Sequence, residues 1–516
     1  MDKGSGASVG QSAGSGSGAA PTGEAAGSAA YLGTDTGATA SGGYAGAPAM
    51  KVAVADPQAG EGYKDYGTNA WTDAAQDRLS TFAADVDTAS YSIVRRKLGE
   101  GSLPPAAAVR VEEFVNYFRY AYGAPAAGEA FAVHMDAAPS PFNSGRHILR
   151  VGVSTKAKSI GERKKMNLVF LVDVSGSMQS IDKLELAKRS LRILVDNLKD
   201  GDTVALVTYA GSTRVVLPAT GLEHKGQILA ALDELTAGGS TGMGSGIDLA
   251  YKEAMKGLAP DAESRVIILS DGDANVGPTS HQGLLDLIAG KVKEGVMLST
   301  IGFGMGNYQD ETMEQLANKG NGNNYYIDGL SQAKRVFAEQ IGSTLEVVAQ
   351  DVKLQVDFDP RMVARYRLVG YENRNLADDS FRDDKVDAGE VGAGHQVTAL
   401  YEVELVKAID KSYPLATVHV RHKVPKATKA SEAVFAFAPT DLSSSFAGAS
   451  ADLRFAFATA AFADVLRGAE DAEHWDLAEI KKIAAAAAGD DADRKELVGL
   501  IDQARQLKGG SATLAK

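Results

Sequence analysis

Five oxygen-bearing side chains in three separate segments of the sequence could together bind a hard metal ion. They are Asp173, Ser175, Ser177, Thr241 and Asp271. The first three stand on a glycine-containing turn, the fourth follows a pair of glycines, and the last ends an apolar run. Three hydroxyls and two carboxylates suit Mg²⁺ or Mn²⁺, which prefer octahedral oxygen coordination and retain some of their waters.

The charge of this ligand set predicts how such a site would be used. Two aspartates only neutralise a divalent cation, and the other three ligands are uncharged. A cation held in this way stays electrophilic and can accept one more anionic oxygen. The side chain of an Asp or Glu from a partner protein is a natural sixth ligand. We therefore expect a metal-bridged contact with another protein.

The segments around these side chains alternate between strand and helix patterns. Apolar runs typical of strands buried on both faces cover 168–173, 203–209, 265–271, 296–303 and 324–327. Helical spacing of apolar residues covers 184–198, 246–257, 283–293, 311–318 and 331–346. This alternation predicts an α/β fold with a doubly wound, mostly parallel sheet. Ligands bind such sheets at the carboxyl ends of the strands, where Asp173 falls.

Strand patterns of period two flank this block on both sides. They occur within 130–155 and again after residue 350, in VKLQVDF, VARYRLVGY, HQVTALYEVEL and LATVHVRHKV, with Pro360 and Gly389, Gly392 and Gly394 expected in turns. Isolated hairpins are only marginally stable, so the first group needs a partner. We expect the α/β domain to be inserted in a β-sandwich built from both groups. The alternative is two separate small β-domains.

The sequence as a whole predicts five regions. They are a disordered tether rich in Gly, Ser and Ala at 1–55, helices followed by strands at 60–160, the α/β domain at 164–346, a β-rich region at 350–440, and a helical region at 450–508. The tether is interpreted either as a spacer that holds the folded part away from an anchor or as a tail without a role. The terminal helices are interpreted as a structural cap, and the alternative is a role in binding a partner.

Bulk composition narrows the classes of function. The net charge of −13 argues against nucleic acid and against a polybasic membrane contact. The chain has no cysteine, and no run of 18 apolar residues could span a bilayer. No signal peptide is visible, but Met1 leads directly into low-complexity sequence, as expected of a chain from which a targeting segment has been trimmed.

Residues 164–346 resemble a von Willebrand factor type A domain, and the five oxygen ligands match the metal-ion-dependent adhesion site of that family. The flanking sequences LSTFAADVDTASYSIVRRKL and DVKLQVDFDPRMVARYRLVGYENRNL resemble a bacterial group of uncharacterised von Willebrand A proteins that usually carry a lipoprotein signal. The resemblance covers about 60–440 and much of 450–508. It implies an envelope protein that binds its partner through Mg²⁺, Mn²⁺ or Ca²⁺, with a lipid anchor in a longer precursor, although the lipid-acceptor cysteine is absent here.

Two other roles are alternatives to adhesion. A metal-assisted hydrolase needs a base near the ion, but the histidines are scattered, and His419 and His422 lie on a strand pattern that points them to opposite faces. The sequence contains no Gly-x-Ser-x-Gly, P-loop or His-Glu-x-x-His motif, so we expect no enzymatic activity. The other role is an assembly or chaperone subunit for an ATPase, which a cytosolic location would favour.

Four further polar residues are interpreted as caps or turn formers rather than as ligands: Asp85, Asp87, Asp273 and Asn275. The family resemblance also suggests a conformational hypothesis. Capture of a ligand by the metal site would shift the last helix of the α/β domain, at 331–346, and this helix runs directly into the β-region.

Overall fold

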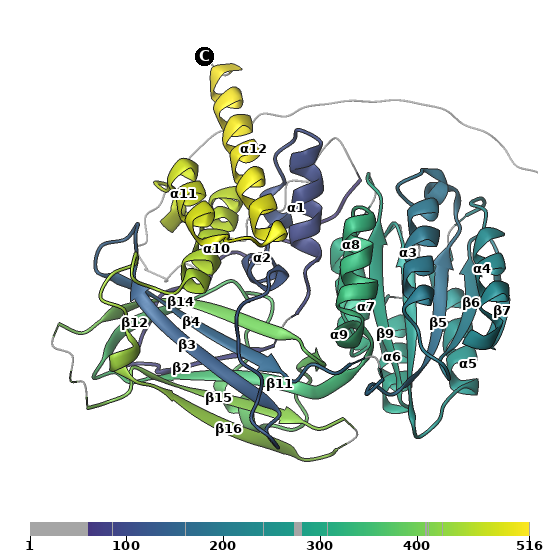
Figure 1. The fold of residues 1–516 in the computed structure, drawn as a ribbon, viewed down its shortest axis with the longest axis horizontal. Coiled ribbons are helices and arrows are strands. Elements are labelled where there is room, and N and C mark those ends of the chain that lie inside the picture. Colours follow the sequence, from purple (N-terminus) through teal and green to yellow (C-terminus); the bar gives the residue numbers. More distant parts are fainter. Residues whose placement is uncertain are drawn as a thin grey trace, which may run out of the picture. The chain divides into compact units, whose positions relative to one another are not determined.

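The computed structural model describes residues 60–514, apart from 85, 160, 241, 273–280, 307, 408–409, 411 and 426. The tether predicted at 1–55 lies outside the described residues, and so do Thr241, Asp85, Asp273 and Asn275. The described part contains three sheets, one of six strands and two of about five (Figure 1). One of these sheets carries the candidate site.

The six-stranded sheet has the order β10-β9-β8-β5-β6-β7 and is parallel except for its edge strand β7. Its strands are β5 (Lys165–Asp173), β6 (Thr203–Tyr209), β7 (Thr213–Gly221), β8 (Ala262–Ser270), β9 (Val296–Phe303) and β10 (Asn324–Ile327). Every strand expected in this block is present. The pattern missed β7, whose side chains are mostly half-buried and which contains Pro218, a residue that sheets tolerate mainly at an edge.

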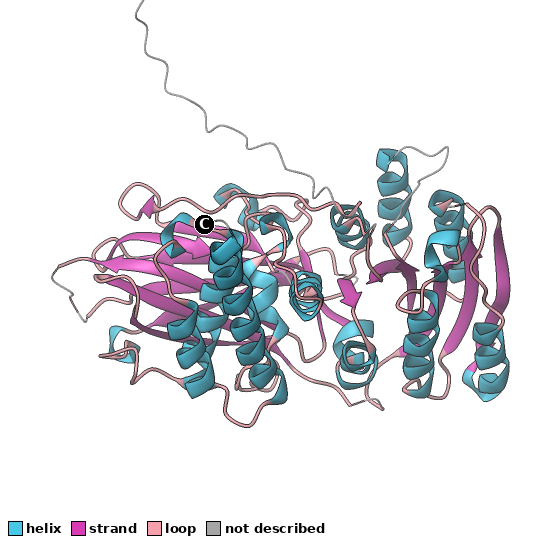
Figure 2. Ribbon diagram, turned by 90° about the horizontal axis from the view of Figure 1, so that it is seen from above, coloured by secondary structure: helices cyan, strands magenta, loops and turns pink. Residues whose placement is uncertain are grey.

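Helices cover both faces of this sheet (Figure 2). One face packs against α3 (Leu184–Asp196), α4 (Lys225–Asp233), α8 (Leu330–Lys334) and α9 (Ile341–Leu345). The other face packs against α5 (Met243–Lys256), α6 (His281–Lys293) and α7 (Asp310–Lys319). Strand β5 contributes side chains to the apolar cores on both faces of the sheet. Leu168 and Phe170 lie in the core beside α3, and Val169 and Leu171 lie in the core beside α5. This two-sided burial explains its continuous apolar run.

The helix expected at 331–346 is not continuous. It consists of α8, a π-helical turn at Arg335–Glu339, and α9 after Gln340. Tertiary contacts accompany the irregularity, because Arg335 donates to Asp493 and to the backbone carbonyl of Tyr117. Irregular turns of this kind often mark functional segments of helices.

Strands from before residue 160 and after residue 350 share the other two sheets. One sheet has the order β1 (Thr72–Asp73), β12 (Val363–Val369), β14 (Gln396–Leu405), β4 (Arg146–Thr155) and β3 (Phe131–Pro139). The other has the order β13 (Gly389–Gly392), β11 (Val347–Phe358), β15 (Ala416–Lys423) and β16 (Ala430–Phe437), with β2 (Leu79–Ala83) also pairing with β11. Both sheets contribute to one apolar core. The predicted sandwich is therefore confirmed, and two separate β-domains are wrong.

Glycines 389 and 392 were expected in turns but lie within strand β13. A Cβ on Gly389 would lie 1.8 Å from the carbonyl oxygen of Ala84, and one on Gly392 would lie 2.1 Å from that of Ser343. Close backbone approach therefore requires glycine at both positions. The sequence pattern alone does not separate this role from a turn.

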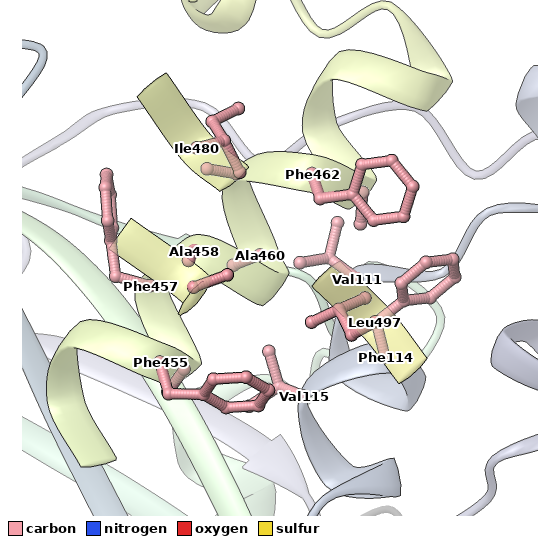
Figure 3. Packing of buried hydrophobic residues seen from close by; sticks show 14 of the residues in the cluster. Val111, Phe114, Val115, Phe455, Phe457, Ala458, Ala460, Phe462, Ile480 and Leu497 are labelled. Atoms are coloured by element: carbon pink, nitrogen blue, oxygen red, sulfur yellow. The ribbon is translucent and has the colours of Figure 1, made fainter. Parts of the chain in front are cut away.

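The C-terminal helices α10 (Ala451–Arg467), α11 (Leu477–Ala487) and α12 (Ala492–Leu514) pack against α1 (Ala89–Gly99) and α2 (Val111–Tyr117). Figure 3 shows Phe114 and Val115 of α2 facing Phe462 and Phe455 of α10, with Leu497 of α12 beside them. The helical prediction for this region is confirmed. In the part of the chain that the structure describes, we find no helix that is long and apolar enough to cross a membrane.

Polar contacts connect the N-terminal helices with the α/β block. Asp87 accepts from the backbone N–H of Asn324 (2.8 Å) and from Arg374 (3.1 Å), and Arg95 forms an ion pair with Asp328 (2.6 Å). Asp87 is 3% exposed, so its carboxylate forms these hydrogen bonds inside the fold. This agrees with its interpretation as a structural residue rather than a ligand.

Candidate metal-binding site

Asp173 is the last residue of β5 and is fully buried at the carboxyl edge of the sheet. Its Oδ1 accepts a hydrogen bond from the backbone N–H of Ser175 (2.8 Å). Its Oδ2 accepts one from the hydroxyl of Ser270 (3.1 Å), which is the last residue of the neighbouring strand β8. These two bonds fix the direction of the carboxylate at the junction of two parallel strands.

Ser175 and Ser177 follow on a short 3₁₀ turn, Gly176–Gln179. Their hydroxyl oxygens lie 3.0 Å apart, so the two side chains converge. Ser175 is buried and Ser177 is half-buried. The turn thus brings the hydroxyls of Ser175 and Ser177, which are two residues apart in the sequence, next to each other beside Asp173.

The glycine loop that precedes Thr241 is docked on this turn. Gly238 donates to the carbonyl of Val174 (2.8 Å), and Gly176 donates to the carbonyl of Gly239 (3.0 Å). Gly239 has φ +91°, a conformation that favours glycine. Thr241 itself lies outside the described residues, so its role as a ligand stays a prediction.

Asp271 follows directly after β8 and is also fully buried. Its Oδ2 lies 3.0 Å from Nζ of Lys183, whose side chain is 9% exposed. The reasoning from sequence missed Lys183, because a lysine at the start of a helix is ordinarily a solvated residue. Its position shortly after the serine turn is the one available signal.

The electrostatics of Asp173 fit a bound cation. Burial raises the pKa of Asp173, and the nearby charge of Asp271 adds to this effect, while hydrogen bonds from Ser175 oppose it. Within the described part of the chain, Asp173 forms no ion pair, whereas Asp271 pairs with Lys183. A buried carboxylate is costly without a countercharge. A divalent cation would supply that charge, so the donor set fits a metal.

Other candidate residues do not join this site. Asp87 is used in the contacts between α1 and the sheet, as described above. His419 contacts Glu432 (2.9 Å), and His422 packs edge-on against Phe131. Because the two histidines have different neighbours, the expectation that they do not form a pair is confirmed.

Comparison with known proteins extends this picture. The family described as von Willebrand factor type A domain matches residues 167–339, one described as von Willebrand factor matches 57–150, and one described as the C-terminal part of the uncharacterized protein YfbK matches 343–507. YfbK of Escherichia coli (strain K12), described as uncharacterized, is 39% identical over 468 residues, or 86% of this chain and 80% of that protein.

More distant similarities are also found. An uncharacterized protein of Synechocystis sp. is 27% identical over 213 residues, which cover 41% of this chain and 50% of that protein. The solved structure of a von Willebrand factor type A protein from Catenulispora acidiphila is 17% identical, covers 70% of this chain and 88% of that chain, and has a TM-score of 0.43.

Proposed function

Because this chain belongs to the YfbK family of bacterial von Willebrand factor A proteins, we propose that it binds a protein partner through a divalent metal ion. Such domains typically mediate metal-dependent protein interactions. The proposed metal ligands are Asp173, Ser175, Ser177, Thr241 and Asp271. The partner would contribute a carboxylate of Asp or Glu as a further ligand.

The buried carboxylate of Asp173 is the observation that carries this proposal. It is held at the strand end by hydrogen bonds from Ser175 and Ser270 and has no ion pair among the described residues. When bound, a divalent ion supplies a Lewis-acidic centre that accepts an anionic oxygen. The two serine hydroxyls contribute no charge, so the positive charge would not be over-neutralised by the protein. We expect Mg²⁺ in this role, with Mn²⁺ or Ca²⁺ as substitutes.

We propose binding rather than catalysis. The contacts of the site residues serve to orient carboxylates, through Ser175 and Ser270, or to neutralise one, through Lys183. We further propose a location in the bacterial cell envelope, where the segment 1–55, rich in Gly, Ser and Ala, would serve as a spacer.

A carboxylate probe tests this function without knowledge of the partner. Titration of Mg²⁺ into metal-stripped protein is repeated in the presence of acetate and of acetamide, which has a similar shape but no charge. Because coupling between two ligands is reciprocal, acetate should tighten the apparent Mg²⁺ affinity several-fold and acetamide should not. In Asp173→Ala both the binding of Mg²⁺ at this site and the effect of acetate on it should vanish.

Equal Mg²⁺ affinity with acetate and acetamide would contradict the proposed recognition of a carboxylate. The variant Asp200→Ala removes an acid from an exposed turn and serves as the matched control. It should keep the acetate effect of the unmodified chain.

A further inference from the structure

A second group of carboxylates lies away from the site at the end of β5. Asp351 belongs to β11, Asp387 to the turn that leads into β13, and Glu390 to β13 itself. One carboxylate oxygen from each residue lies within 4.8 Å of one from each of the others. Three like charges at this distance repel one another unless a proton or a cation lies between them.

Glu390 lacks the partners that its neighbours have. Asp351 pairs with Lys423 (2.5 Å), and Asp387 lies 4.0 Å from Lys319. Glu390 is 8% exposed, and its Oε1 is buried without a hydrogen-bond partner among the described residues. Its carboxylate nevertheless faces the other two. Buried acceptors of this kind are rare in folded proteins and call for an explanation.

Burial raises the pKa of Glu390 well above its ordinary value, and the charges of Asp387 and Asp351 raise it further. Burial likewise raises the pKa of Asp387. The arrangement is therefore costly while all three groups are ionised. The charges of Arg265 and Arg374 oppose the increase in the pKa of Glu390 only in part. A divalent cation between the three carboxylates would supply the remaining positive charge and so remove the cost.

A pocket of about 220 Å³ adjoins the group and opens a path to solvent. Asp387 and Glu390 line it, together with Asn373. The amide nitrogen of Asn373 donates to Glu314 (2.7 Å), while its Oδ1 is buried and has no hydrogen-bond partner among the described residues. Two residues that line the pocket, Glu390 and Asn373, thus each contain a buried oxygen for which the described residues supply no donor. Oxygen acceptors with no matching donors suit a metal ion better than they suit a neutral organic ligand.

We propose that Asp351, Asp387 and Glu390 form a calcium-binding site that is separate from the site at the end of β5. Ca²⁺ accepts carboxylate and amide oxygens at about 2.3–2.6 Å in flexible geometry, so one ion reaches oxygens that are up to roughly 4.8 Å apart. Mg²⁺ requires shorter, nearly octahedral bonds. The bound ion joins β11, which directly follows α9, to β13.

The test removes the first site and measures calcium at the second. The full chain carrying Asp173→Ala, or Asp173→Asn if the alanine variant does not fold, is stripped of metal and titrated with Ca²⁺ by calorimetry. We expect one Ca²⁺ per chain, a midpoint of thermal unfolding raised by roughly 2–4 °C, and at least tenfold weaker binding of Mg²⁺.

Two added substitutions locate the ion. Glu390→Gln keeps the shape of the side chain, removes its charge and should abolish calcium binding. Asp384→Asn makes the same change in charge in the same loop, at a residue that pairs with Arg421, and should leave binding intact. Failure of the folded Asp173 variant to bind Ca²⁺ would overturn the proposal, as would retained binding in Glu390→Gln. Mg²⁺ binding as tight as that of Ca²⁺ would overturn the assignment to calcium.

Discussion

The ammonium group of Lys183 lies 3.0 Å from Oδ2 of Asp271, so a protein cation already contacts one of the two carboxylates of the proposed metal site. The side chain of Lys183 fits here because it passes close to the backbone of a glycine. Gly304 has φ +72°, and a Cβ there would lie 2.2 Å from Cγ of Lys183. The side chain of Lys183 therefore passes Gly304 and ends at Asp271. Its charge there opposes that of an incoming metal ion.

Replacing Lys183 should strengthen metal binding. In Lys183→Met, Asp271 no longer shares its charge with an ammonium group, and we expect Mg²⁺ affinity to rise about tenfold, or about 1.4 kcal/mol. The metal-free protein should become less stable by roughly 1–3 kcal/mol, because the buried carboxylate of Asp271 loses its ion pair with Lys183. Calorimetry and urea unfolding measure the two effects.

Lys252→Met is the matched control for this lysine, since Lys252 is exposed and its one ion pair among the described residues is with Asp248, one helical turn away. It should change neither quantity appreciably. Unchanged or weaker Mg²⁺ affinity in Lys183→Met would mean that the lysine does not oppose the ion.

The broken helix that spans α8, the π turn and α9 should respond to ligand capture. Gln332 accepts from the hydroxyl of Tyr117 (3.0 Å), and Arg335 pairs with Asp493 of α12, so this segment connects the sheet to the terminal helices. We expect amide hydrogen exchange at 330–345 to change when Mg²⁺ and acetate are added together. Identical exchange with and without them would refute movement of this segment.

Stability should depend on pH through His395. Burial lowers the pKa of His395 to about 3, and its Nδ1 accepts from the backbone N–H of Gly392 (3.1 Å). The unfolded chain has the ordinary histidine pKa of about 6.5. Between these values the unfolded state binds more protons, so this group's contribution to stability is complete above pH 6.5 and decreases as the pH falls.

For His395 alone, the loss between pH 7 and pH 5 should be about 2 kcal/mol. Urea unfolding of the unmodified chain and of His395→Gln at both pH values isolates this part. The difference in unfolding free energy between the two proteins should shrink by that amount at pH 5. A difference that does not vary with pH would show that folding leaves the pKa of His395 at its ordinary value.

The terminal helices should contribute to the stability of the fold through their apolar contacts. Leu497 is fully buried against α2 and α10 (Figure 3). Leu497→Ala should cost about 2–5 kcal/mol, from lost burial and the cavity it leaves. Val434→Ala removes apolar atoms from a residue that is 57% exposed and should cost well under 1 kcal/mol. Similar urea midpoints for the two variants would argue that the helices pack loosely.

The spacing of apolar residues, together with the glycines and prolines that separate the segments, was enough to predict much of this fold. The two-sided burial of β5 appears directly in its apolar run, and the alternation in β15 appears in the spacing of Val418 and Val420. The strands that the pattern missed are short or half-exposed, as in β1, β7 and β16, where few apolar side chains report the period.

Some residues of the candidate site could likewise be predicted from the sequence, and others could not. Asp173, Ser175 and Ser177 could be proposed because they are close in sequence and follow a strand. The hydroxyl of Ser270, which orients Asp173, and the ammonium of Lys183, which contacts Asp271, depend on how distant segments meet. The group around Glu390 could not be predicted because Asp351 lies on β11, whereas Asp387 and Glu390 lie at β13, and only the folded sheet brings these two strands together.

The account depends most directly on whether Asp173 binds a metal ion. Calorimetric titration of Mg²⁺ into metal-stripped chain measures this, with Asp173→Ala and the exposed Asp200→Ala compared at the same concentration. We predict that the unmodified chain and Asp200→Ala bind one Mg²⁺ with the same affinity. Asp173→Ala should lose this binding and keep only the weaker Mg²⁺ binding expected at Asp351, Asp387 and Glu390. Equal Mg²⁺ binding in folded Asp173→Ala would contradict the assignment of this site.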